Sequence, residues 1–148
     1  IQAQKLEQLD IVEVVERALE IFPSDIIKFN ALPKAINATV DKDQLNRIVT
    51  NLVKNAIQSI PEGKTPKVEV EISEKTGKIY IQVTDNGSGI DPAIGEKIFE
   101  PKFTTKTSGM GLGLPMIKNI IQTYNGEINY KTTLSQGTVF VVSFPKKQ

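Results

Sequence analysis

The chain has 148 residues, and its 18 lysines and arginines nearly balance 17 aspartates and glutamates, which gives a formal charge of +1. It contains no cysteine and no histidine, which excludes disulfides, thiol nucleophiles, histidine acid–base catalysis and Cys/His zinc sites. Hydrophobic residues make up 39% and charged residues 24%, as in a single globular domain with its own core. The balanced charge disfavours a binder of duplex nucleic acid, and no apolar run is long enough to span a bilayer.

The N-terminal part predicts one helix followed by two strands. Asp10 is suited to cap a helix over residues 11–22, because apolar residues recur there at helical spacing. The apolar stretches 26–32 and 36–40 are short, and Pro33 lies between them, so we interpret them as a pair of strands.

The middle of the chain predicts a second helix and then a hairpin. Asp41 opens this helix with Gln44 in the capping-box position, its apolar stripe is the most regular in the chain, and residues 61–63 end it. Apolar and polar residues alternate over 68–72 and again over 79–83, with a polar turn between them. This pattern is typical of an antiparallel hairpin with one buried face.

The C-terminal part begins with a segment, residues 90–113, that is rich in glycine and proline and lacks strong periodicity. A segment of this kind is typically a functional lid or disordered. Pro115 suits the first turn of a third helix that ends at residues 125–126, and a last hairpin follows over 128–133 and 138–144. The element order predicts an α+β two-layer sandwich, with three helices on one face of a mixed or antiparallel sheet.

Asn51 and Asn55 form the first candidate site. They lie four residues apart on the second helix, about 40° apart around its axis, at the edge of the apolar stripe. Two amides there could coordinate a ligand bound against the sheet, although two solvated asparagines are the simpler interpretation. Each asparagine lowers helix stability by roughly a few tenths of a kcal/mol relative to alanine, which favours a use for the pair.

The second candidate is the run from Asp85 to Ile90, which follows a buried strand and contains Gly87 and Gly89. Glycines let the backbone turn and approach a ligand closely, and a carboxylate at the strand end could accept a hydrogen bond from a planar base. The alternative is a tight hairpin turn, because Asn-Gly is a strong turn signal. The lid that follows, in place of a strand, weakens this alternative.

The third candidate is the glycine-rich run of Gly109, Gly111 and Gly113 that precedes Leu114. Backbone N–H groups and the positive end of a following helix would form a phosphate cradle. The run lacks the Lys-Ser/Thr of a Walker loop and does not follow a strand, so a flexible connection remains the alternative. Residues 104–108, just upstream, could supply hydroxyl groups and one cation to phosphate oxygens.

In their order and spacing, these motifs resemble the N, G1, F and G2 boxes of sensor histidine kinases, which belong to the GHKL ATPase superfamily together with gyrase B and heat-shock chaperones. The four boxes are carried by residues 51–56, 85–89, 98–106 and 109–114, and Gly137-Thr138 resembles the family's final element near the adenine. The resemblance implies the Bergerat-type α/β sandwich that binds ATP.

This resemblance also implies a division of the chain. Residues 10–148 would form the catalytic domain, with a flexible ATP lid at about 90–113. Residues 1–9 look like the end of a linker helix from a missing dimerisation domain. A chain that begins with Ile1 is expected to be a fragment of a longer protein.

The resemblance assigns roles to individual residues. Asp85 would accept a hydrogen bond from the adenine amino group, and Asn55 would be a ligand of Mg²⁺. Gly87 and Gly89 would let the backbone pass the base, and Phe99 with Phe103 would hold the lid. Lys106 would offset phosphate charge, and the catalytic residues would be Asn51, Asn55 and Lys106. The other residues implied at the nucleotide, which include the lid glycines, are Asn51, Ile90, Thr105, Lys106, Gly109, Gly111, Leu112, Gly113, Leu114 and Thr138.

Asn51 replaces the glutamate that activates water in hydrolysing relatives, so phosphoryl transfer is expected over hydrolysis. The expected acceptor is a histidine on the dimerisation domain of the same parent, with a response-regulator receiver domain as an indirect partner and no nucleic acid. The location is expected to be cytoplasmic, in a parent that could be an inner-membrane sensor.

The alternatives to a histidine kinase are an ATP-binding regulatory module, such as a pseudokinase or anti-sigma-type protein, and a true ATPase. Lys102 and Pro115 depart from the family pattern.

Overall fold

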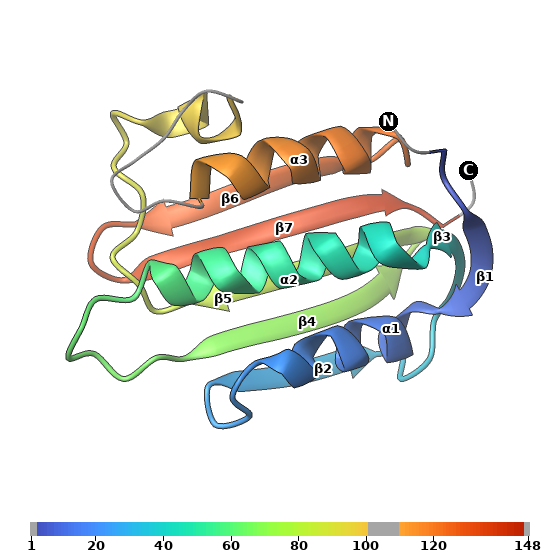
Figure 1. Ribbon diagram of the computed structural model, residues 1–148, viewed down its shortest axis with the longest axis horizontal. Helices are drawn as coiled ribbons and strands as arrows, with labels where there is room; N and C mark the ends of the chain where they lie inside the picture. Colours follow the sequence, from blue (N-terminus) through green and yellow to red (C-terminus); the bar gives the residue numbers. More distant parts are fainter. Residues whose placement is uncertain (1–2, 101–109, 147–148) are drawn as a thin grey trace.

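A five-stranded sheet and three helices form two layers in the computed structural model, which describes residues 3–100 and 110–146 (Figure 1). The strand order is β2-β4-β5-β7-β6, in which β2 and β4 are parallel and all other neighbours are antiparallel. In this order the strands are β2 (Ile27–Leu32), β4 (Val68–Lys75), β5 (Lys78–Asp85), β7 (Gly137–Pro145) and β6 (Glu127–Thr133). The predicted α+β fold with a mixed sheet is confirmed.

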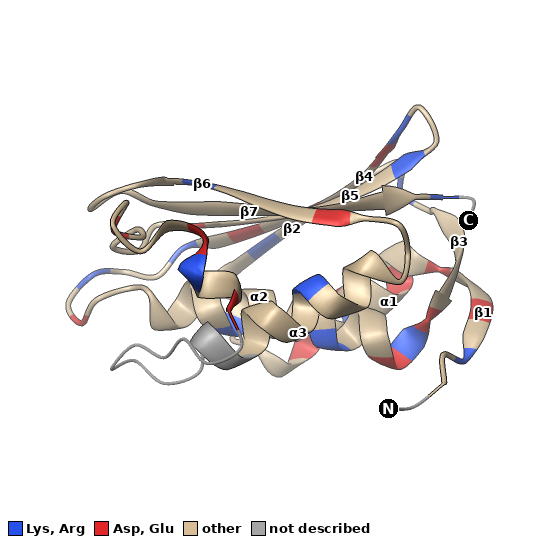
Figure 2. Ribbon diagram, turned by 90° about the horizontal axis from the view of Figure 1, so that it is seen from above, with Lys and Arg blue, Asp and Glu red and all other residues tan. Residues whose placement is uncertain are grey.

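The helices cover one face of the sheet, as the view from above shows (Figure 2). They are α1 (Ile11–Ala18), which the 3-10 turn η1 (Leu19–Ile21) continues, α2 (Lys42–Gln58) and α3 (Met110–Gln122), and a short 3-10 helix, η2 (Gly95–Phe99), precedes α3. Both predicted caps are present. Asp10 Oδ1 accepts a hydrogen bond from Val12 N–H at 3.1 Å, and Asp41 Oδ1 accepts one from Gln44 N–H at 3.1 Å.

Gln44 does not complete a capping box directly. Instead the Tyr124 hydroxyl lies between the two groups: it accepts from Asp41 N–H at 2.8 Å and donates to Gln44 Oε1 at 2.9 Å. The N-terminus of α2 is therefore held by a residue that follows α3 in the chain.

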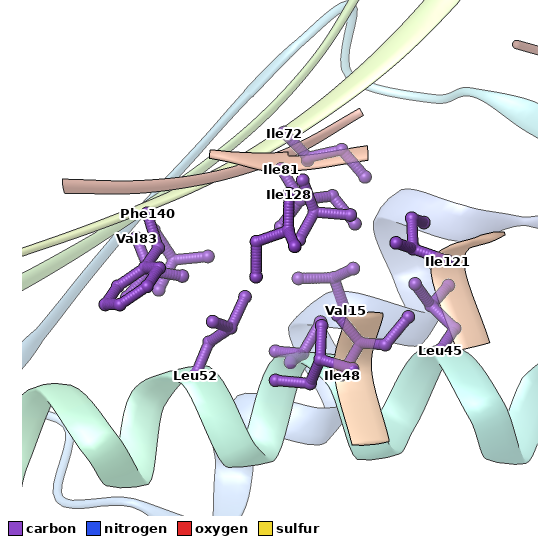
Figure 3. Packing of buried hydrophobic residues seen from close by; sticks show 14 of the residues in the cluster. Val15, Leu45, Ile48, Leu52, Ile72, Ile81, Val83, Ile121, Ile128 and Phe140 are labelled. Carbon is purple, nitrogen blue, oxygen red and sulfur yellow. The ribbon is translucent and has the colours of Figure 1, made fainter. Parts of the chain in front are cut away.

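The core lies between the two layers, where aliphatic side chains from α2 and α3 meet those of the central strands (Figure 3). In β4 the inward residues Val68, Val70 and Ile72 are buried, while Glu69 and Glu71 point to solvent. This alternation is the expected pattern for a sheet with one covered face.

The N-terminal segment differs from the prediction. Residues Leu6–Asp10 form a strand, β1, and not the end of a helix. This strand pairs antiparallel with β3 (Asn37–Asp41) in a separate two-stranded sheet, so the ladder satisfies backbone groups that a helix would have satisfied internally. The strands β2 and β3 are both present as predicted, but they are not partners of each other.

The third helix begins earlier than predicted. It starts at Met110, so Pro115 is inside the helix and not in its first turn, and Gly111 and Gly113 are helical. Pro115 has no N–H and cannot donate to the carbonyl four residues earlier, at Gly111. A Cβ at Gly113 would lie 3.3 Å from Asn51 Oδ1, so the glycine allows α3 to approach α2 closely at this point.

Candidate functional site

Asp85 is buried at the end of the central strand β5, with 7% of its surface exposed. Its Oδ1 accepts hydrogen bonds from Gly87 N–H at 2.8 Å and from Thr138 N–H at 3.3 Å. Burial raises the pKa of this carboxyl above its usual 3.8, while those two N–H groups, the Ser59 hydroxyl and the charge of Lys64 oppose the rise. The carboxylate is thus held in one orientation by backbone donors.

The loop after Asp85 packs between the C-terminal end of α2 and the turn of the last hairpin. A Cβ at Gly87 would overlap Ser59, and a Cβ at Gly89, where φ is +80°, would lie 2.7 Å from the carbonyl oxygen of Thr133. Ser88 N–H donates to the Ser59 carbonyl at 3.0 Å. Both glycines are therefore required by close backbone approach.

The hairpin-turn alternative for this loop does not hold. Both edges of β5 are already paired, with β4 on one side and β7 on the other, and the next element is the helix η2. The amide of Asn86 binds the α2–β4 connection instead, accepting from Lys67 N–H at 2.9 Å and donating to the Thr65 carbonyl at 2.8 Å.

Asn55 and Asn51 lie on α2 beside an open groove. Asn55 is 3% exposed, and its Nδ2 has no hydrogen-bond partner among the described residues. Asn51 is half-buried, and its Nδ2 donates to the Arg47 carbonyl at 2.8 Å. The groove has a volume of about 510 Å³ and is lined by Arg47, Asn51, Lys54, Asn55, Gln58, Gly113 and Met116. The structure thus brings both asparagines and Gly113 together.

The C-terminal ends of β5 and α2, which carry Asp85 and Asn55, lie at the same end of the molecule (Figure 1). Ser59 caps α2 one turn after Asn55, whose carbonyl accepts from Ser59 N–H at 3.1 Å. The same Ser59 contacts the loop that follows Asp85. Ser59 therefore links the two halves of the candidate site.

The amide of Asn55, whose Nδ2 has no partner within residues 3–100 and 110–146, could fit a magnesium ion beside the groove. An unpaired buried donor costs roughly 1–3 kcal/mol, so this amide is ready for an external partner. Rotation of the amide by half a turn exchanges its oxygen and nitrogen, which allows it to present the oxygen ligand that Mg²⁺ prefers.

The remaining predicted residues fall into three groups. Ile90, Phe99 and Thr138 are buried around the Asp85 loop and the last hairpin, and the Phe99 and Tyr130 ring centroids lie 6.0 Å apart. The Leu114 side chain is fully buried in the hydrophobic core and does not face the groove, and Gly111 and Leu112 belong to the first turn of α3. The third group lies outside the described residues: Phe103, Thr105, Lys106 and Gly109, together with Lys102.

Two contributors were not identified from the sequence. Ser59, the C-cap of α2, lies four residues after Asn55, so the spacing could have indicated it. Thr132 contacts both Ile90 and Thr138 through its hydroxyl, and no local signal marks it. In the described part of the chain, none of the helices combines the length and the apolar character that a bilayer crossing requires.

With this geometry in view, the chain can be compared with known proteins. Residues 40–148 match the family described as histidine kinase-, DNA gyrase B- and HSP90-like ATPase. The chain therefore belongs to this family of ATPases.

Its relatives narrow the class further. The chain is 34% identical to the sensor histidine kinase ZraS of Salmonella typhimurium over 147 residues, which is 95% of this chain and 31% of that protein. It is 41% identical to sporulation kinase A of Bacillus subtilis over 107 residues, which is 72% of this chain and 17% of that protein. The chain thus spans less than a third of these relatives.

Solved structures agree with this class. The catalytic domain of histidine kinase ThkA superposes with a TM-score of 0.87 at 26% identity, covering 98% of this chain and all of that one. The mycobacterial sensor histidine kinase MprB gives 0.80 at 26% identity, covering 97% and 99%. The chain is the catalytic ATP-binding domain of the kind found in two-component sensor histidine kinases.

Proposed function

We propose that this domain binds ATP with Mg²⁺ between Asp85 and the asparagines of α2, and transfers the γ-phosphoryl group to a histidine on a separate dimerisation domain of the same parent protein. The observation that carries the proposal is the link through Ser59 between a buried carboxylate and a buried amide whose Nδ2 has no partner in the described part of the chain. A response-regulator receiver domain would then accept the phosphoryl group from that histidine. We place the domain in the cytoplasm, where ATP is available.

Asp85 would recognise the base. Its Oδ1 is occupied by two backbone donors, which leaves capacity on the carboxylate for the adenine amino group. Guanine presents a carbonyl oxygen at that position, and two acceptors repel each other, so ATP would be preferred over GTP.

Asn55 would be the protein ligand of the metal, with water and the triphosphate supplying the rest. Bound Mg²⁺ would neutralise charge on the phosphate oxygens. Because a neutral amide holds a cation weakly, the metal would arrive with the nucleotide. Lys54 and Arg47 line the same groove and would add positive charge near the phosphates.

Asn51 favours transfer over hydrolysis. An amide cannot take a proton from water, so Asn51 would position the phosphate region without activating a nucleophile. In the transfer step the acceptor imidazole forms a P–N bond and loses its proton, the bond from the γ-phosphorus to the bridging oxygen breaks, and ADP leaves. Phe103, Thr105, Lys106 and Gly109 remain proposed contributors to phosphate binding.

The test uses the chain with γ-labelled ATP, Mg²⁺ and a separately expressed dimerisation domain that carries the acceptor histidine. Label on that partner, absent when its histidine is replaced by alanine, is the expected result. ATP binding without transfer to any histidine-bearing domain of the parent would favour a regulatory module instead. Steady phosphate release by the chain alone, unchanged in Asn51→Ala, would contradict the role given to Asn51.

A further inference from the structure

Thr132 in β6 makes three hydrogen bonds with a single hydroxyl. Its Oγ1 accepts from Ile90 N–H at 2.8 Å, lies 3.2 Å from the Gly137 carbonyl oxygen and lies 2.9 Å from Thr138 Oγ1. A hydroxyl has one proton and two lone pairs. When Thr132 donates to Gly137 and the Thr138 hydroxyl donates to Thr132, its whole capacity is used.

These partners surround the base-recognising carboxylate from two sides. Ile90 ends the glycine-containing loop that leaves Asp85, and Thr138 is the residue whose N–H donates to Asp85 Oδ1. Gly137 lies against the Asp85 main chain. The Thr132 hydroxyl therefore connects the segment that follows Asp85 with the strand β7 that supports it.

A second contact strengthens this connection. Ser135 N–H donates to the Ser88 carbonyl at 2.8 Å, so the β6–β7 turn contacts the same loop at a point two residues before Ile90. Thr132 itself is partly buried beside this turn. Thr132 is the side chain through which β6 reaches both Ile90 and Thr138.

We propose that Thr132 is a positioning residue for nucleotide binding: its hydroxyl holds Ile90 and Thr138 in the arrangement that sets the orientation of the Asp85 carboxylate toward the base. This inference rests on the proposed function, because it assigns Thr132 to the same ATP site. Thr132 acts through these neighbours and does not contact the nucleotide itself.

The test compares ATP affinity, measured by calorimetry, in three variants. Thr132→Val removes the hydroxyl and keeps the shape, and it is expected to raise the Kd about tenfold, as the loss of one or two hydrogen bonds would. Thr132→Ser keeps the hydroxyl and is expected to stay within about twofold of the wild type. The matched control is Thr133→Val, the same change at the adjacent exposed position, with no expected effect.

The outcomes separate this inference from the proposed function. If the unmodified chain does not bind ATP, the proposed function fails; if it binds and Thr132→Val binds equally well, only the role of Thr132 fails. A purely structural role would lower the unfolding midpoint without changing the Kd at a temperature where the variant is folded, and this result would also overturn the inference.

A further measurement does not depend on the folding of any variant. The Ile90 amide of the unmodified, nucleotide-free chain is expected to exchange slowly with deuterium because Thr132 accepts its hydrogen bond. Exchange at the rate of an unstructured peptide would contradict the proposal. If Thr132→Val does not fold, Thr132→Ala takes its place in the affinity comparison.

Discussion

Gly137 and Asp85 are in backbone contact: a Cβ on Gly137 would overlap the carbonyl oxygen of Asp85, and the φ of Gly137 is +131°. The contact joins the start of β7 to the main chain of Asp85 at the end of β5. The absence of a side chain at Gly137 thus allows β7 to approach the main chain of Asp85 closely.

Gly137→Ala is therefore expected to destabilise the domain strongly. Gly77→Ala is the matched control, because Gly77 also has a positive φ, +77°, in a hairpin turn, but has open space where its Cβ would lie. The control should lose about 1–2 kcal/mol from strain alone, and Gly137→Ala about 1–3 kcal/mol more from overlap. Urea unfolding measures both, and equal losses would argue against the close contact.

Asp85→Asn is expected to separate binding from stability. The asparagine Oδ1 can still accept from Gly87 and Thr138, and no charge is buried, so the free energy of unfolding should change by less than about 1 kcal/mol. ATP affinity should fall by about tenfold to a hundredfold, because a charged acceptor for the adenine amino group is lost. Unchanged affinity by calorimetry would remove Asp85 from the site.

The pH dependence of ATP binding follows from the same carboxyl. Burial raises the pKa of Asp85 above 3.8, so protonation begins at a higher pH than in an exposed aspartate. Binding that needs the ionised form should weaken as the pH falls through this raised pKa. ATP affinity is measured as a function of pH for the wild type and for Asp85→Asn, and the difference between the two curves removes the contribution of ATP protonation. Parallel curves would exclude a role for the Asp85 carboxyl in the pH dependence.

Asn55→Ala is expected to remove the advantage that Mg²⁺ gives to ATP binding. The wild type should bind ATP more tightly with Mg²⁺ than with a chelator, whereas the variant should bind equally in both. Stability should be unchanged or higher by up to about 1 kcal/mol, because a buried Nδ2 that finds no partner among the residues described is lost and alanine favours the helix. A variant that keeps the full Mg²⁺ effect would contradict the assignment of Asn55.

Asp41 is expected to make the free energy of unfolding depend on pH in the acidic range. The Lys5 N–H is the largest of the contacts that hold the pKa of Asp41 below 3.8, and Gln44 N–H and Asp43 N–H act in the same direction against the effect of burial. A lowered pKa stabilises the fold fully above the unfolded value of 3.8, and this contribution is lost as the pH falls through the folded value.

Two substitutions separate this charge from the helix cap. Asp41→Asn should keep the cap and flatten the acid limb of the urea midpoint, while Asp41→Ala should also lose about 0.5–2 kcal/mol at neutral pH. An acid limb in Asp41→Asn as steep as that of the wild type would contradict the assignment.

Sequence patterns predicted the elements whose signals are local. The caps at Asp10 and Asp41, the alternation over β4 and β5 and the last hairpin all agree with the structure. Strand β1 was missed because Leu6–Asp10 has no alternating pattern and its partner, β3, lies on the far side of β2 in the chain. The start of α3 was misplaced because Pro115 favours a first helical turn, whereas contact of Gly113 with Asn51 of α2 depends on tertiary packing.

In the candidate site, too, the residues with local sequence signals were predicted and those defined by long-range contacts were not. Motif spacing predicted Asp85 and the α2 asparagines as candidates, and in the structure Ser59 links Asn55 to the loop that follows Asp85. Thr132 carries no signal of its own, because its main partner, Ile90, lies 42 residues earlier. Long-range hydrogen bonds of this kind cannot be found from a single sequence.

The central position of β5 has a consequence for how ligands act on the whole domain. Asp85 ends a strand that pairs with β4 along its length and with β7 as far as Thr84, so opening of the middle of the sheet disrupts the carboxylate together with the rest of the fold. A nucleotide bound there stabilises the entire fold by mass action. The melting temperature should therefore rise with the logarithm of the free nucleotide concentration, and a thermal-shift measurement should report occupancy of the proposed base site without any acceptor domain.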